Sequence, residues 1–100
     1  MIKHIVLWKL HEYAGGKTGS ENGLEVKRLI EGMTGKIPGV IKLEVGLNFN
    51  SGPDDADIVL YSEFDDKQAL ELYQVHPVHE AIKEFIKSVR SERHVIDYEV

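Results

Sequence analysis

Hydrophobic and polar residues alternate in four segments of the chain, and between them apolar residues recur at helical spacing. Alternation with a period of two predicts strands, whereas a three-to-four residue spacing predicts helices. We therefore expect strands at 2–10, 41–49, 56–64 and about 93–100, and helices at about 23–35 and from 65 or 66 to about 89. Residues 11–22 are rich in Gly, Lys, Thr and Ser and predict a loop.

The order of these segments, βαββαβ, predicts one α+β domain over residues 1–100 with the ferredoxin-like arrangement. In this arrangement a four-stranded antiparallel sheet carries both helices on one face. The first helix has an incomplete apolar stripe, from which Val26 is offset; its members are Leu24, Leu29, Ile30 and Met33.

The first and third predicted strands are apolar on both faces. Ile5 and Leu7 alternate with Val6 and Trp8 in the first strand, and Val59 and Tyr61 lie in the third. Two helices can cover only one face of a sheet, and an exposed apolar face is usually an interface. The pattern therefore predicts a homodimer in which two sheets pack face to face.

Composition excludes several classes of function. The chain has 12 Lys and Arg against 17 Asp and Glu, a formal net charge of −5, which argues against binding to nucleic acid because such binding depends on clustered basic residues. Because the chain has no cysteine, it can form no disulfide and has no thiolate nucleophile or ligand. No segment approaches the roughly 18 to 20 apolar residues of a membrane helix. With no signal-peptide pattern at the start, we expect a cytoplasmic protein that does not act at a membrane.

The segment from Tyr73 to His79 gathers one phenol and two imidazoles within seven residues, around the break at Pro77. Proline suits the first position of the restarted helix. His79 is the candidate base, because a neutral imidazole can accept a proton from an acidic carbon. Tyr73 is the candidate donor to a carbonyl oxygen that develops negative charge. The alternative is that Tyr73 is core packing and His79 is a surface residue.

A pocket between sheet and helices is expected, because His4 shares a strand face with Val6 and Trp8. We assign these three residues and His76 to ligand binding, with His4 orienting the ligand. A buried histidine that is merely hydrogen-bonded is the alternative for His4. For His76, which precedes proline, helix capping is the alternative.

We predict no metal and no cofactor. His76 and His79 are three residues apart and can share a helix face, but the sequence shows no third ligand. Asp54, Asp55 and Asp57 resemble part of a calcium loop, yet the glycine and glutamate that such a loop needs are absent, so we expect a solvated turn.

Four segments together resemble the stress-responsive dimeric α/β-barrel domain family: residues 2–10, 37–40, 72–79 and 95–100. The resemblance implies a protomer whose sheet joins that of its twin to form a barrel. A plant branch of this family closes linear polyketides by aldol condensation with a Tyr and a His that Tyr73 and His79 match. The first-strand histidine that lines the pocket of that branch is matched by His4.

Three functions remain open from the sequence. The first is an enzyme of cyclase or lyase type, or a binder, that takes a small apolar carbonyl compound. The second is a non-catalytic, stress-associated binding or assembly protein. The third, by analogy of fold only, is a monooxygenase that degrades haem or oxidises quinols.

Overall fold

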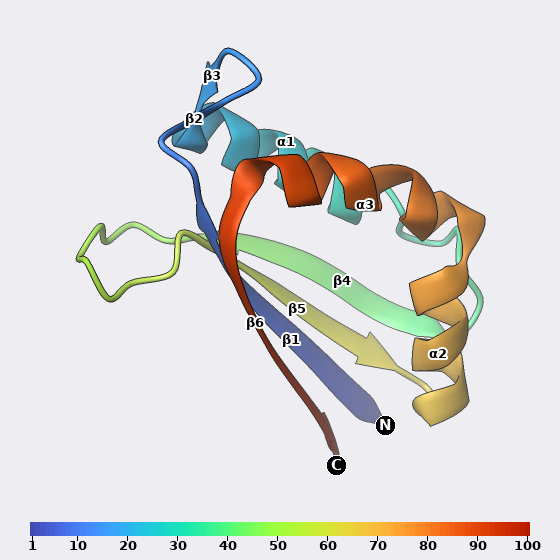
Figure 1. Ribbon diagram of the computed structural model, residues 1–100. Helices are drawn as coiled ribbons and strands as arrows, with labels where there is room; N and C mark the ends of the chain where they lie inside the picture. The colour runs from blue at the N-terminus through green and yellow to red at the C-terminus, as the bar shows by residue number, and fades with distance from the viewer.

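The computed structural model describes all of residues 1–100 and has the predicted ferredoxin-like α+β fold. Four antiparallel strands form the main sheet in the order β4-β5-β1-β6. The helices lie together on one face of this sheet, as Figure 1 shows. The elements are β1 Ile2–Leu10, β2 Tyr13–Ala14, β3 Lys17–Thr18, α1 Gly19–Glu31, β4 Val40–Leu47, β5 Ile58–Phe64, α2 Lys67–Val75, α3 Pro77–Val89 and β6 Arg90–Glu99.

The expected loop at 11–22 is instead a two-stranded hairpin followed by the first turn of α1. Thr18 is the N-cap of α1. Its hydroxyl accepts from Glu21 N at 3.2 Å, while the Glu21 carboxylate accepts from Thr18 N at 3.0 Å. This capping box satisfies two backbone donors that would otherwise lack a partner, so the helix begins four residues before the predicted start.

The predicted stripe of α1 is wrong in part. Val26 is completely buried, together with Ile30 and the following Met33, whereas Leu24 is 57% exposed. The buried face continues backward to Asn22, whose Nδ2 donates to Ala14 O at 3.1 Å and so holds the hairpin against the helix. This polar contact, which the apolar pattern does not report, links the start of α1 to the hairpin.

A β-bulge near the start of β4 interrupts the expected alternation. The pairing with β5 shifts between Val40 and Lys42, so Ile41 is displaced from the core side and is half exposed. The strand ends at Leu47, two residues before the predicted end, and Phe49 is 96% exposed. One extra residue in a bulge moves the side chains beside it out of the strict period of two.

The helical break at Pro77 separates α2 from α3, as predicted. His76 is the N-cap of α3, and its Nδ1 accepts from Val78 N at 3.1 Å. Capping thereby ties this imidazole to the backbone. β6 follows α3 directly at Arg90, three residues earlier than expected.

The other face of the main sheet has no covering element, as the bare lower side of the sheet in Figure 1 shows. We call its apolar residues the open-face patch; they are Ile5, Leu7, Val59, Tyr61, Ile96 and Tyr98. The patch runs across three adjacent strands, so the two-sided character of the predicted strands is confirmed.

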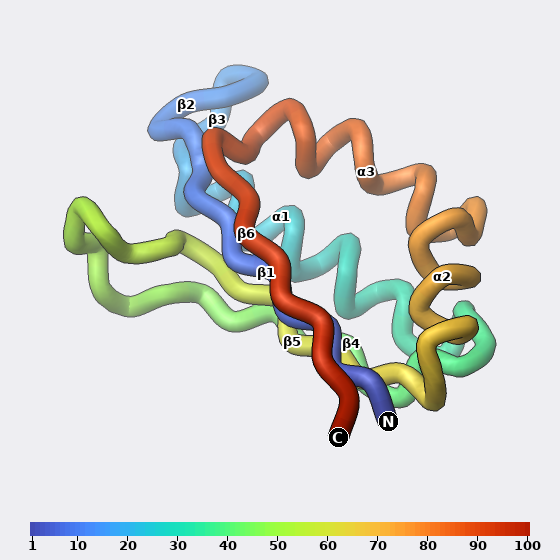
Figure 2. Tube along the Cα trace, turned by 60° about the horizontal axis from the view of Figure 1, so that its bottom comes forward, coloured from blue at the N-terminus to red at the C-terminus, as the bar shows by residue number.

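Side chains of α1 bond to the outer edge of β4 at one residue. At Val45 the backbone N–H donates to the Glu31 carboxylate at 3.0 Å, and the carbonyl accepts from Lys27 Nζ at 2.6 Å. β6 forms the opposite edge, and its end lies beside the start of β1. Figure 2 shows both termini there, where Val100 N donates to Met1 O at 3.0 Å.

Candidate functional site

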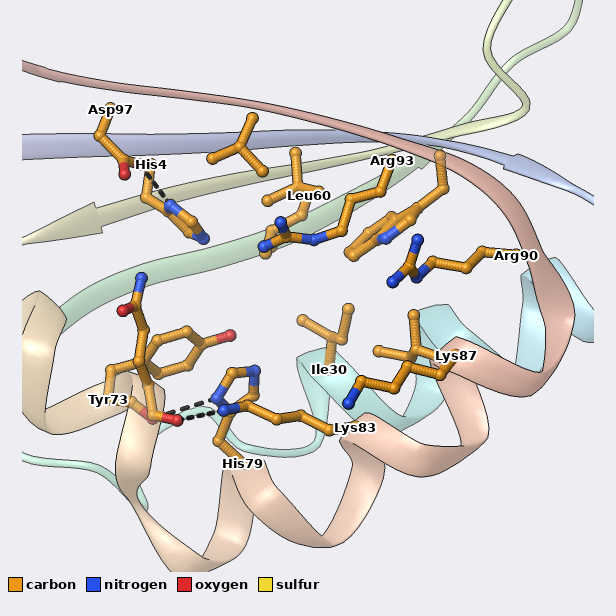
Figure 3. Close-up of a pocket in the computed structure, with 15 residues that line it drawn as sticks. His4, Ile30, Leu60, Tyr73, His79, Lys83, Lys87, Arg90, Arg93 and Asp97 are labelled. Atoms are coloured by element: carbon orange, nitrogen blue, oxygen red, sulfur yellow. Dashed lines mark hydrogen bonds and ion pairs between the residues drawn. The ribbon is translucent and has the colours of Figure 1, made fainter.

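A cavity of about 540 Å³ lies between the sheet and the helices α2 and α3 (Figure 3). Its size falls in the usual range for small-molecule sites. Besides Tyr73, six apolar residues form its floor and walls: Val6, Trp8, Ile30, Leu60, Ile86 and Val95. The sequence-predicted residues His4, Val6, Trp8, Tyr73 and His79 all line this cavity.

Tyr73 carries the one side-chain hydroxyl that is buried without a hydrogen-bond partner. The residue is 1% exposed, on α2, and its ring packs edge-on against Phe64 with 5.0 Å between centroids. Burial raises the pKa of the phenol, so it stays protonated and keeps its O–H available to donate. Figure 3 shows this hydroxyl pointing into the cavity.

His79 stacks on the Tyr73 ring, with 4.1 Å between centroids and 19° between planes. The Nδ1 atom lies 3.1 Å from Tyr73 O. Because a carbonyl only accepts, Nδ1 carries the proton and Nε2 holds a free lone pair. Burial, with the nearby Lys83 ammonium adding to it, lowers the pKa of His79 to about 4, so the ring is neutral at physiological pH.

His4 is buried in the sheet at 3% exposed, with Asp97 as its partner. The two residues face each other in the register of β1 and β6, and His4 Nδ1 donates to the Asp97 carboxylate. This bond holds the ring with Nε2 directed into the cavity, as Figure 3 shows. The ring centroids of His4 and Tyr73 are 6.3 Å apart, so both imidazoles flank the phenol.

The structure does not place His76 with these residues. It is absent from the cavity lining, and its Nδ1 is occupied by the backbone of α3. A second cavity, about 640 Å³, is larger but lies at the other end of the sheet. It is lined by the hairpin region and the loop after β4 and has none of the candidate catalytic side chains.

Sequence reasoning missed Asp97 and four basic residues of the lining, which are Lys83, Lys87, Arg90 and Arg93. Alternation in β6 held a usable signal, because Asp97 shares a face with Val95 and lies opposite His4. The spacing of four between Lys83 and Lys87 likewise places them on one helix face. No cluster of three or more His, Cys, Asp or Glu is arranged to hold a metal ion.

Fold and site together define a ferredoxin-like α+β domain with a ligand-sized cavity between sheet and helices. The chain belongs to the stress responsive A/B barrel domain family, whose model matches residues 2–100. No curated protein matches it, and no helix is long and apolar enough to span a membrane.

Solved structures support this membership. A dimeric protein of ferredoxin-like fold from Bacteroides fragilis is 36% identical over 99% of this chain and 95% of that one, with a TM-score of 0.87. A Dabb family protein from Mesorhizobium loti is 25% identical over 99% and 95% of the two chains, with a TM-score of 0.71. A hydroxynitrile lyase from Passiflora edulis is 14% identical over 99% and 92%, with a TM-score of 0.78, which shows a shared fold alone.

Proposed function

We propose that this protein binds a small, largely apolar carbonyl compound in the cavity and removes a proton from the carbon beside the carbonyl. Proton removal of this kind is the common step of aldol-type cyclisation and cleavage. The observation that carries the proposal is the Tyr73 hydroxyl, a buried donor without a partner that faces the cavity between two imidazoles. A carbonyl oxygen of the ligand supplies the missing acceptor.

The chemistry assigns a role to each group. Tyr73 O–H donates to the carbonyl oxygen and stabilises the negative charge that develops there. His79 Nε2 takes the proton from the neighbouring carbon, because its ring is stacked on Tyr73 and is therefore beside any carbonyl held by the hydroxyl. The electrons of the broken C–H bond move to the oxygen as an enolate, and the imidazolium returns the proton to a carbon. His4, held by Asp97, orients the ligand from the sheet side.

Deuterium exchange tests this function without knowledge of the natural substrate. Acetophenone in D₂O should exchange its methyl protons faster with the protein than without it, as followed by NMR. Tyr73→Phe and His79→Asn should each lower the protein-dependent rate by about 100-fold. Asn retains a donor near the position of Nδ1, so His79→Asn removes the base and keeps the bond to Tyr73 O. His4→Asn should weaken binding and affect the exchange rate at saturation less than His79→Asn does.

Matched controls are Tyr61→Phe on the open face and His94→Asn on β6, neither of which lines the cavity. Both should exchange at the wild-type rate. If wild type, Tyr73→Phe and His79→Asn all exchange alike, the alternative function, a non-catalytic stress-associated binding or assembly protein, is favoured. Melting temperatures separate the enzyme from the non-catalytic protein further. Tyr73→Phe removes a hydroxyl that has no partner, so its melting temperature should be close to that of the wild type even where exchange is lost.

We also propose that the protein acts as a homodimer through the open-face patch. Its apolar side chains, among them Leu7 at 40% and Ile96 at 58% exposed, cover the face that no helix protects. The Bacteroides fragilis protein, which is 36% identical, is dimeric, and this supports the same assembly here. Face-to-face packing leaves the cavity on the helical side of each protomer accessible.

A further inference from the structure

The charge of the cavity is opposite to that of the chain. The whole chain has five more acidic than basic side chains. The cavity lining has four basic side chains and one carboxylate, that of Asp97, which is already bonded to His4. A concentration of positive charge in a concave site of an acidic protein raises the local concentration of anions.

Two of the four cations are already paired, and two are free. Lys83 Nζ donates to the Glu80 carboxylate at 2.6 Å and to Gln74 O, and Lys87 lies 4.0 Å from Glu84. The guanidinium groups of Arg90 and Arg93 form no hydrogen bond or ion pair with any other residue of the lining. Figure 3 shows both guanidinium groups reaching into the cavity, Arg90 from the junction of α3 and β6 and Arg93 from β6.

A third donor without a partner lies at the same end. The indole N–H of Trp8 is buried and makes no hydrogen bond, and Trp8 faces Arg93 in the register of β1 and β6. A buried donor without an acceptor has lost its hydration and gained no hydrogen bond in return. Two free guanidinium groups beside such a donor therefore form a site that lacks an acceptor.

We infer that the ligand is an oxo acid, whose carboxylate is held by Arg90 and Arg93 while its carbonyl reaches Tyr73. The planar fork of a guanidinium matches the two oxygens of a carboxylate. The C-terminal end of α3, whose C-cap is Arg90, contributes partial negative charge here, so a singly charged carboxylate fits better than a doubly charged phosphate. The apolar walls, Val6, Leu60 and Ile86, then enclose the carbon chain between the two groups.

This inference names the substrate class of the proposed function and rests on that function for the carbonyl end alone. Calorimetric titration with benzoylpropionate and with its uncharged methyl ester tests the anionic end. The acid should bind about 10- to 100-fold more tightly than the ester, as expected for charge-assisted hydrogen bonds. Arg90→Gln combined with Arg93→Gln should abolish this preference and leave the affinity for the ester unchanged.

Arg28→Gln is the matched control, because Arg28 is paired with Glu25 on the exposed face of α1 and should retain the preference for the acid. Equal affinity for acid and ester in the wild type, or a preference that survives loss of both arginines, would overturn the inference. Inorganic phosphate that displaces the acid at equal concentration would overturn the choice of carboxylate.

The two proposals fail separately. Tyr73→Phe should keep the preference for the acid even where proton exchange is lost. A wild-type protein that prefers the acid but exchanges no protons would disprove the proposed chemistry and leave the carboxylate site standing.

Discussion

Burial acts on Tyr73 and His79 in opposite directions, and both changes favour the neutral form. The pKa of the phenol is raised and that of the imidazole is lowered, because in each case desolvation disfavours the charged state. The site therefore presents a neutral donor and a neutral acceptor side by side. Neither group needs a change of protonation before it meets a carbonyl compound.

The depressed pKa of His79 predicts a loss of stability on mild acidification. The pKa is about 4 in the folded state and 6.5 in the unfolded state, so between these values the unfolded chain binds a proton that the folded chain does not. The free energy of unfolding should fall as pH drops from 6.5 toward 4 and receive no further contribution from His79 below that range.

Urea titrations at several pH values check this. His79→Asn, which cannot titrate, should show a smaller loss over the same range, and the exposed His94→Asn should follow the wild type. The carboxylates contribute equally to the pH dependence of the free energy of unfolding in all three proteins, so their contribution cancels in the comparison. Identical pH profiles for wild type and His79→Asn would contradict the burial of this imidazole.

The sequence supported the choice of Tyr73 and His79 because they lie within seven residues of each other, and of His4 because it shares a strand face with apolar residues. Asp97 was missed because it lies 93 residues from His4 and meets it only through the register of two paired strands. Long-range pairing of this kind depends on which strands are neighbours. A residue-by-residue reading therefore identified the chemical groups and not the partner that orients one of them.

At the scale of elements, the N-terminus of α1 depends on a polar motif. Thr18→Ala should lower the free energy of unfolding by about 1 kcal/mol, because it removes the hydroxyl that accepts from Glu21 N. Chemical denaturation measures the change. Ser20→Ala is the control; this exposed residue in the first turn should change stability by less than about 0.5 kcal/mol. Equal effects of the two substitutions would contradict the capping box.

Apart from the short hairpin of β2 and β3, element types and their order were predictable from periodicity, whereas several boundaries were not. Strands β1 and β5, which are apolar on both faces, match their predicted bounds closely. The start of α1 is set by Thr18 and Glu21, and alternation is lost at the start of β4 because of a bulge. The hydrophobic pattern carries no information on side-chain to backbone hydrogen bonds or on bulges, and these set the boundaries that the prediction missed.

For the whole molecule, the open-face patch predicts the state of assembly. Sedimentation at micromolar concentration should show a dimer for the wild type. Leu7→Glu should shift it to a monomer, because a carboxylate placed in an apolar interface loses its hydration without gaining a partner. Leu24→Glu, an equivalent change at an exposed leucine of α1, should remain dimeric. A monomeric wild type would rule out the proposed assembly.

The bonds of Lys27 and Glu31 to Val45 obstruct one edge of the sheet against a further strand. An exposed edge strand is a template for pairing with another chain, and charged side chains at the edge are one of the ways in which proteins block such pairing. A strand added beside β4 would have to break both bonds at Val45, whereas β6 forms the other edge of the sheet. Growth of the sheet from the β4 edge is therefore disfavoured, and association is directed to the bare apolar face instead.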